Sequence, residues 1–174
     1  MYYYCCAYPY WYPNYPIVQP QVIQNVGHQY SQSQRENINL KDYGPNPYVV
    51  NINEAAKQNK TFRTALWTGE HLQVTLMSID VGGEIGLEIH PDTDQFLRIE
   101  QGRGVVQMGK EKDNLNYQRR VYDDSAIMVP AGYWHNVKNT GNVPLKLYSI
   151  YAPPHHPRGT VHQTKKDAME AESH

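Results

Sequence analysis

The sequence predicts an all-β fold, a barrel or a sandwich, for the chain from Phe62 onward. Short segments of alternating apolar and polar residues follow one another there, and turn residues separate them about every 8 to 12 positions. Glycine and proline stand at the boundaries of these segments. At 174 residues the chain has the length of a single domain, and it shows no internal repeat.

The strands follow from this alternation, and the segments between them have the residues of turns. A glycine-containing hairpin turn is expected at 101–104, a polar loop at 110–118 and a second turn at 139–142. The expected strands are 62–68, 72–79, 84–90, 95–100, 104–108, 119–122, 125–129, 135–139 and 145–151.

Two short helices flank these strands. The first is expected over 53–58, with Asn53 as its N-cap. The chain leaves the strands after the prolines at 153–154. A second, short helix is expected further on, with Thr164 as its N-cap and Asp167 in its first turn.

The N-terminal segment, residues 1–48, differs in composition from the rest. Tyrosine and proline dominate its first half, and glutamine, asparagine and serine its second. Proline opposes both helix and strand, so a disordered or extended tail is expected before a barrel at 49–155 and a C-terminal segment at 156–174. The tail is either without a role or adhesive, since its tyrosine-rich end resembles those of bacterial spore-coat proteins.

The composition excludes several classes of partner. The net charge is −1 and charged residues are few, which argues against nucleic acid and membrane surfaces. No apolar run approaches the ~20 residues needed to span a bilayer, and no secretory signal is visible. Cys5 and Cys6 are adjacent and cannot form a disulfide framework. A cytoplasmic location is expected, with the spore coat as the alternative.

Four side chains are candidates for one metal site. Glu88 and His90 are two apart, so on a strand they share a face. Gln95 and His135 can approach from neighbouring strands. A carboxylate, an amide oxygen and two imidazoles form a mixed nitrogen and oxygen site for one divalent transition metal: Fe, Mn, Ni, Co or Zn.

The residues between these candidates leave two orientations open. If Leu87 and Ile89 pack between the sheets, Glu88 and His90 face solvent. If Leu87 and Ile89 face outward, Glu88 and His90 lie inside, where an ionised glutamate needs a partner or a metal.

The spacing of the first three candidates is that of a known motif. Gly82 is followed after five residues by Glu88, then by His90, after four more residues by Gln95, and after six more by Gly102. This resembles the first motif of the cupin family, which has histidine where Glu88 stands and glutamate where Gln95 stands. Both replacements can still bind a metal through oxygen.

The second cupin motif is also matched, except at its first position. Pro130, Gly132, His135 and Asn139 have the spacing of the motif, and Asp124 replaces its leading glycine. The resemblance implies the cupin double-stranded β-helix, a jelly-roll barrel, and a homodimer.

Other polar residues near these motifs are candidates for the pocket or for contacts to the metal ligands. Tyr133 and Asn136 flank His135, and His156 and His162 belong to the histidine-containing segment after the last strand. That segment either packs on the barrel surface or folds across its mouth, where it would supply a proton carrier or a substrate contact. No catalytic residue, and in particular no general base, is identifiable.

Three functions remain open for a small-molecule substrate. An enzyme acting on a sugar or sugar phosphate is the first, because the chain resembles the mannose-6-phosphate isomerase-like cupins. A metal-dependent dioxygenase is the second, and a non-catalytic metal- or sugar-binding module of a spore coat or envelope is the third. A polar, ionisable group beside the metal would favour an enzyme over a binding module.

Overall fold

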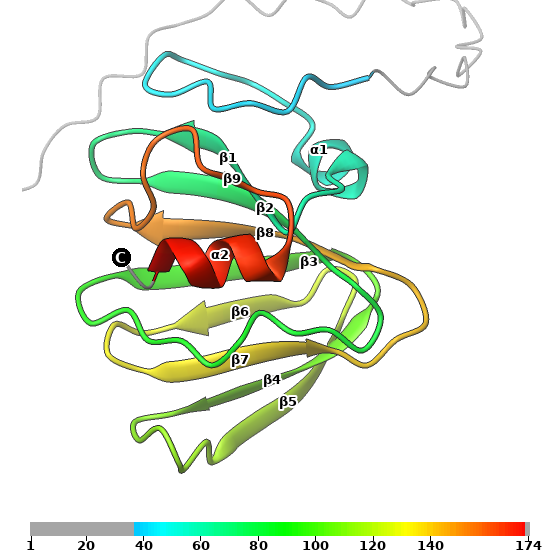
Figure 1. Ribbon diagram of the computed structural model, residues 1–174, viewed down its shortest axis with the longest axis vertical. Helices are drawn as coiled ribbons and strands as arrows, with labels where there is room; N and C mark the ends of the chain where they lie inside the picture. The colour runs from blue at the N-terminus through cyan, green and yellow to red at the C-terminus, as the bar shows by residue number, and fades with distance from the viewer. Residues whose placement is uncertain (1–36, 173–174) are drawn as a thin grey trace, which may run out of the picture. The chain divides into compact units, whose positions relative to one another are not determined.

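The computed structural model describes residues 37–172, which form two antiparallel sheets and two short helices (Figure 1). One sheet has six strands in the order β6-β3-β8-β2-β1-β9, and the other has three in the order β5-β4-β7. The helices are α1 (Ile52–Gln58) and α2 (Lys165–Glu172). The strands are β1 (Arg63–Thr68), β2 (Gln73–Ile79), β3 (Asp94–Gln101), β4 (Arg103–Gly109), β5 (Tyr117–Tyr122), β6 (Ala126–Val129), β7 (Trp134–Asn139), β8 (Leu145–Ala152) and β9 (Val161–His162).

The apolar core lies between the two sheets, as alternation along the strands requires. Leu97 and Ile99 of β3 and Leu147 of β8 face Val106 of β4 and Val137 of β7, and all are buried. Ala168 of α2 joins the same cluster, so α2 covers the barrel on the side toward the viewer in Figure 1. The predicted cupin-type barrel is confirmed.

The segment 84–90 is the one expected strand that does not form a regular strand. It is attached to the edge of β7 by isolated bridges, Glu84 to Lys138 and Glu88 to His135. Gly86 has a φ of 112°, which interrupts an extended conformation between the two bridges. Each of the other expected strands is present, and β9 is an addition.

The hairpin expected at 101–104 is wrong. Gly102 does make a tight turn, with a φ of 99°, but the strands that it joins do not pair with each other. β3 pairs with β6 and β8, whereas β4 pairs with β5 and β7. The turn therefore carries the chain from one sheet to the other, and sequence periodicity does not distinguish such a crossing from a hairpin.

The helix caps were predicted correctly at one helix and not at the other. In α2, the Asp167 amide donates to Thr164 Oγ1 (3.3 Å), and the Thr164 amide donates to Asp167 Oδ2 (2.9 Å), a reciprocal capping box. In α1 the N-cap is Asn51, whose Oδ1 accepts from the Glu54 amide at 3.2 Å. Asn53 lies inside the helix instead, and its amide donates to a side-chain oxygen of Glu100.

The boundary of the expected tail is also wrong for its last part. Ile38, Leu40, Tyr43 and Tyr48 pack against the second apolar cluster of the domain, which includes buried Leu66. Residues 37–48 are therefore part of the folded domain. Residues 1–36, to which the interpretation as an adhesive, spore-coat-like tail applies, lie outside the described residues.

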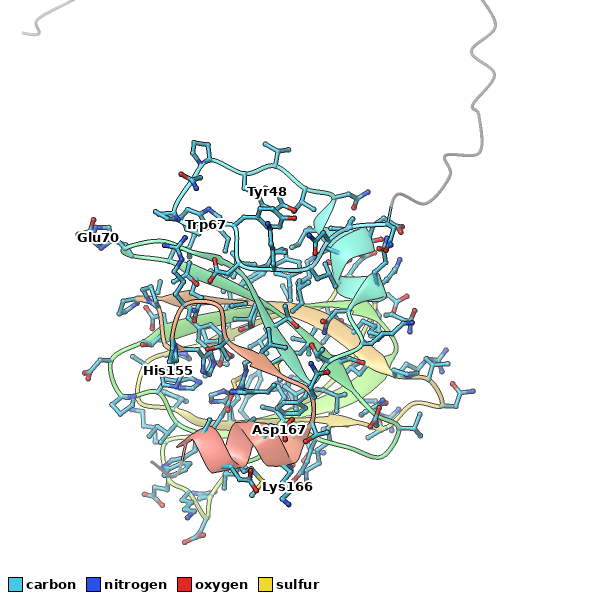
Figure 2. All side chains as sticks on the ribbon, turned by 45° about the horizontal axis from the view of Figure 1, so that its top comes forward. Tyr48, Trp67, Glu70, His155, Lys166 and Asp167 are labelled. Carbon is cyan, nitrogen blue, oxygen red and sulfur yellow. The ribbon has the colours of Figure 1, made fainter. Side chains whose placement is uncertain are left out.

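Polar contacts fix the same segment. Asp42 accepts hydrogen bonds from the Thr68 amide (3.0 Å), the Thr68 hydroxyl (2.6 Å) and the Gly159 amide (2.9 Å). The Trp67 indole donates to the Asn46 carbonyl at 2.8 Å, and Tyr48 and Trp67 lie at the same end of the domain (Figure 2). Asp42 thus ties the N-terminal segment to β1 and to the segment after β8.

Within residues 37–172, neither helix reaches the length and apolar character that a membrane-spanning helix requires.

Candidate metal site

Glu88, His90 and His135 converge at one point between the sheets. Glu88 Oε1 lies 3.2 Å from His135 Nε2 and 3.5 Å from His90 Nε2. One ligand atom from each of the three residues lies within 4.8 Å of the others. Both histidines are buried, and Leu87 is 38% exposed. The site residues therefore face inward, the second of the two orientations that the sequence left open.

The backbone places Glu88 opposite His135. The Glu88 amide donates to the His135 carbonyl (3.0 Å), and the His135 amide donates to the Glu88 carbonyl (2.9 Å). This pair of bonds brings the first motif onto the edge of β7, which carries the second motif. The two motifs are far apart in sequence, but this bridge fixes the separation of their side chains.

The arrangement of donors and acceptors requires a positive charge at the centre. His135 Nδ1 lies 3.1 Å from the Tyr133 carbonyl, which can only accept, so Nδ1 carries the proton of that bond. In the neutral imidazole, Nε2 then presents a lone pair to a carboxylate oxygen at 3.2 Å. Two acceptors this close repel unless a proton or a metal ion lies between them.

Gln95, the fourth candidate, comes from β3 in the opposite sheet. Its Nε2 donates to Ser149 Oγ at 2.9 Å, which fixes the orientation of the amide. Its Oε1 is buried without a hydrogen-bond partner, and so are both ring nitrogens of His90. Because buried polar atoms without partners are rare in folded proteins, these atoms fit a set of ligands for a divalent metal.

The carboxyl group of Glu88 stays ionised although only 14% of the side chain is exposed. Burial by itself raises its pKa, but the neighbouring imidazoles of His135 and His90 and the positive charge of Arg63 lower the pKa well below its usual range. Arg63 Nη2 lies 3.8 Å from Glu88 Oε2. One carboxylate oxygen thus faces the histidines and the other faces a guanidinium.

Arg63 is the site residue that sequence reasoning missed. It begins β1 and is only 1% exposed. An arginine at the start of a strand usually lies at the surface, and only alternation with the strand's inward-facing Ala65 could have indicated otherwise. Its charge offsets that of Glu88, so a divalent metal would leave the site with about two net positive charges.

The segment after β8 folds across the opening above the candidate ligands. The His155 ring lies 4.0 Å from the His90 ring and 4.8 Å from the His156 ring, measured between centroids. Gln73 of β2 holds the segment: its Nε2 donates to the His156 carbonyl (2.9 Å), and its Oε1 accepts from the His156 amide (3.0 Å). The arrangement agrees with the second reading of this segment, in which it crosses the mouth.

A cleft of about 460 Å³ leads from the surface to the candidate ligands. His155, labelled in Figure 2, and Ala171 of α2 are among the residues that line it. Most of the lining is polar or ionisable: Glu88, His90, His155, His156, Thr160 and His162. This is the kind of opening that admits a small polar molecule.

Tyr133 and Asn136 were expected near the ligands. Both support the segments that carry the candidate ligands, and neither side chain forms a hydrogen bond with one of them. The Tyr133 side chain packs against the apolar core, and its carbonyl faces His135. Asn136 points away from His135; its Oδ1 accepts from the Gly86 amide (3.1 Å), and its Nδ2 donates to Glu84 (2.9 Å). Asn136 thus holds the segment that carries Glu88.

Buried His156 gives the metal-free protein a dependence of stability on pH. Its pKa is lowered to about 2, mainly by burial and in addition by the positive charge of Arg63. Between pH 6.5 and that value the unfolded chain binds a proton that the folded chain does not, so stability is lost as the pH falls. From pH 8 to 5 this group should cost about 2 kcal/mol in the free energy of unfolding.

Chemical denaturation in the presence of a chelator measures this loss. His156→Phe keeps a ring but removes the titration, so its stability should fall less over the same pH range. The exposed His71→Phe is the matched control and should follow the wild type. Equal pH slopes for wild type and His156→Phe would show that His156 is not the group responsible.

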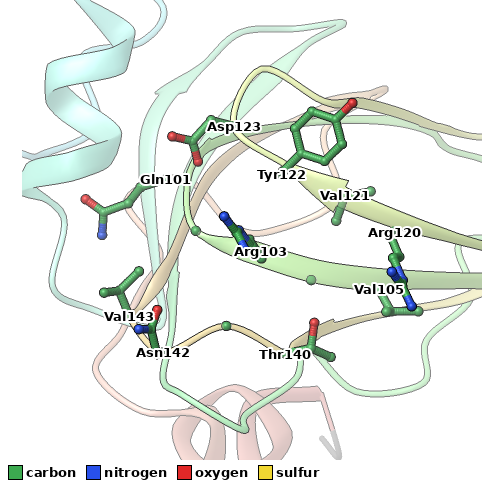
Figure 3. A pocket seen from close by; sticks show the side chains of 13 residues that line it. Gln101, Arg103, Val105, Arg120, Val121, Tyr122, Asp123, Thr140, Asn142 and Val143 are labelled. Atoms are coloured by element: carbon green, nitrogen blue, oxygen red, sulfur yellow. The ribbon is translucent and has the colours of Figure 1, made fainter.

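A larger hollow, of about 1080 Å³, lies at the turns that join the strands (Figure 3). Arg103, Arg120, Tyr122, Asp123 and Asn142 are among the residues that line it. It includes none of the four candidate ligands and no buried polar atom without a partner. The smaller, histidine-lined cleft therefore contains candidate ligands, whereas the larger hollow contains none.

Comparison with known proteins agrees with the fold and with the motifs. Residues 75–151 match the family model described as "Cupin domain". The uncharacterized protein YrkC of Bacillus subtilis is 76% identical over 136 residues, which cover 78% of this chain and 73% of that protein. The chain belongs to the cupin family.

Two further relatives of this cupin are informative about its extent. The crystal structure of BH2720 from Bacillus halodurans has a TM-score of 0.74 and 68% identity, and it covers 75% of this chain and 98% of that one. The uncharacterized protein L612 of Acanthamoeba polyphaga mimivirus is 41% identical over 115 residues, 66% of this chain and 70% of that protein. The similarity thus covers the cupin barrel and more than the 77 residues of the family model.

Proposed function

We propose that this cupin binds one divalent transition metal through Glu88, His90, Gln95 and His135 and is an enzyme acting on a small polar substrate. One observation carries the proposal: one potential ligand atom from each of Glu88, His90 and His135 lies within 4.8 Å of the others, and neither ring nitrogen of His90 has a hydrogen-bond partner. A bound metal would act as a Lewis acid toward a carbonyl or hydroxyl oxygen of the substrate.

The polar lining of the cleft supports turnover rather than binding alone. A binding module needs a complementary surface, whereas an enzyme also needs groups that accept or donate protons beside the reacting atoms. His155 and His156 lie in the cleft within ring contact of each other, and His155 is also in ring contact with His90. His155 can exchange a proton with a substrate, as an isomerase that moves a proton between neighbouring carbons requires, whereas His156 stays neutral and can only form hydrogen bonds. A sugar or sugar phosphate is the first substrate class to test.

A dioxygenase is the second candidate. Two histidines and one carboxylate with open positions are the ligand set of non-haem Fe(II) oxygenases, and Glu88, His90 and His135 provide that set. Elemental analysis of the purified full chain separates the two candidates. Iron, with oxygen uptake in the presence of substrate, supports the oxygenase. Zinc, manganese, nickel or cobalt, with isomerisation in the absence of oxygen, supports the isomerase.

Replacing Gln95 by glutamate should strengthen metal binding. The change restores a negative ligand at a buried position, where the Ser149 hydroxyl can donate to the second carboxylate oxygen in place of accepting from the amide. We expect the affinity for Co²⁺ or Zn²⁺ to rise about tenfold or more. Without metal the variant should melt at a lower temperature than the wild type, because an unpaired carboxylate is then buried.

Calorimetric titration with metal and melting in chelator measure the two effects of Gln95→Glu. Gln118→Glu adds the same charge at the surface of β5 and is the matched control, with both values expected to stay near those of the wild type. An affinity that stays constant in Gln95→Glu would mean that Gln95 does not bind the metal.

A further inference from the structure

The outer face of the six-stranded sheet carries a row of apolar side chains, where a sheet face turned to water normally carries polar ones. Phe96 of β3 is paired with Met128 of β6 on one side and with Ile150 of β8 on the other, and Ile150 is paired with Val74 of β2. Leu97, the next residue of β3, belongs to the buried core, so Phe96 and its row point to the opposite face. The row therefore crosses four neighbouring strands on the side away from the core.

The folded domain covers only one end of this row. Val74 and Tyr48, the latter from the N-terminal segment, both pack against the second apolar cluster. At the other end Met128 is 65% exposed, and Phe96 and Ile150 are half-buried. An apolar strip is thus open to solvent beside the N-terminal segment. On a soluble protein, apolar side chains gathered in this way mark a surface that binds another protein.

The charges beside the row make the surface complementary to itself. Asp94 and Arg98 lie two residues before and two residues after Phe96, so all three share the outer face of β3. Asp94 is exposed, and the Arg98 side chain is 32% exposed. Rotating a second copy by 180° about the line of the row reverses the direction of β3, which places Asp94 of each copy opposite Arg98 of the other. Arg98 also bonds to Glu100 and Asp124, but a guanidinium has five N–H donors and can serve a further carboxylate.

We propose that this row is the contact surface of a homodimer in which the six-stranded sheets of two copies pack face to face. The rotation lays the apolar side chains of one copy against those of the other, with the strands nearly aligned, as in other pairs of packed sheets. The cleft at the candidate metal ligands has none of the row residues in its lining, so each copy keeps its own site, and the inference does not depend on the metal. The row is only about 14 Å across. Because this is small for an obligate dimer, we expect a dissociation constant in the micromolar range.

Sedimentation velocity of the full-length protein at increasing concentration tests the inference. Phe96→Glu sets two like charges against each other at the centre of the contact and should weaken dimerisation about 100-fold or more. Met128→Glu alters a more exposed side chain and should weaken it about tenfold. Asp94→Asn keeps the oxygen that accepts from the Ala131 amide but loses the charge, and it should weaken dimerisation severalfold. All three variants should keep the circular dichroism spectrum and the metal content of the wild type.

Val143→Glu is the matched control, because Val143 is 41% exposed and lies between β7 and β8, outside the row. It adds the same charge and should dimerise as the wild type does. A wild type that stays monomeric would overturn the inference, whatever else covers the face. Dimerisation that is unchanged in Met128→Glu and Phe96→Glu, or weakened as much in Val143→Glu, would show that the contact does not use this row. If Phe96→Glu does not fold, Met128→Glu decides alone. Unchanged dimerisation in Asp94→Asn would contradict the proposed orientation.

Discussion

Replacing His135 by alanine is expected to reduce the metal content of the purified protein from about one ion per chain to a small fraction of that. His135 is fully buried, its Nδ1 is held by the Tyr133 carbonyl, and its Nε2 points at Glu88. The substitution removes one proposed nitrogen ligand, and the alanine side chain cannot bind a metal. Loss of a residue that only hydrogen-bonds to a metal ligand typically lowers metal affinity about 10- to 100-fold. Loss of His135, a proposed ligand itself, should lower the metal affinity by more than that. Elemental analysis and competition with a chromophoric chelator measure both quantities.

The matched control is His71→Ala, because His71 is exposed and can be removed without touching the site. That variant should keep its full metal content. His135→Ala also leaves a cavity, so Glu88→Gln, which preserves size and removes the anionic ligand, is the companion variant. It should lose metal while remaining folded by circular dichroism. Full metal content in either site variant would show that the ligands are assigned wrongly.

Removing residues 37–48 is expected to destabilise the domain strongly. The segment buries parts of Ile38, Leu40, Tyr43 and Tyr48 against the second apolar cluster. At about 1 kcal/mol for each half-buried apolar side chain, this burial is worth about 3–5 kcal/mol. The bonds of Asp42 add to that value. For a domain of this size the melting temperature should fall by about 10–20 °C.

Two truncated chains compare the segment directly, one beginning at residue 37 and the other at Val49. Differential scanning calorimetry of both measures the contribution of residues 37–48 alone. Asp42→Ala in the longer chain should reproduce part of the loss, since it removes the acceptor for the Thr68 and Gly159 amides. Equal melting temperatures for the two truncated chains would show that the segment does not stabilise the barrel.

Much of the fold was predictable from the sequence because alternation depends only on which side chains face the core. The strands from β1 to β8 follow from that pattern. The partners of each strand do not, and so the turn at Gly102 was taken for a hairpin. The pairing of β3 with β8 and of β4 with β7 is set by contacts between residues that lie far apart in the chain.

The candidate ligands were predictable for a different reason. The spacing of Glu88, His90 and Gln95, with His135 in the second motif, is a pattern of residue types that few other structures require. Arg63 belongs to no such pattern, and its burial depends on Glu88, 25 positions later in the chain. The tail boundary failed because tyrosine and proline signal disorder in isolation, whereas Tyr43 and Tyr48 stack on each other at 4.1 Å and pack on the barrel.

The most direct test of the metal site is an anomalous difference map from crystals of the full-length protein grown with Co²⁺ and measured at the cobalt absorption edge. We predict one strong peak per chain between the sheets, about 2.0–2.3 Å from Glu88, His90, Gln95 and His135 donor atoms. A map without a peak at that point, or with its strongest peak elsewhere on the chain, would contradict the proposed site.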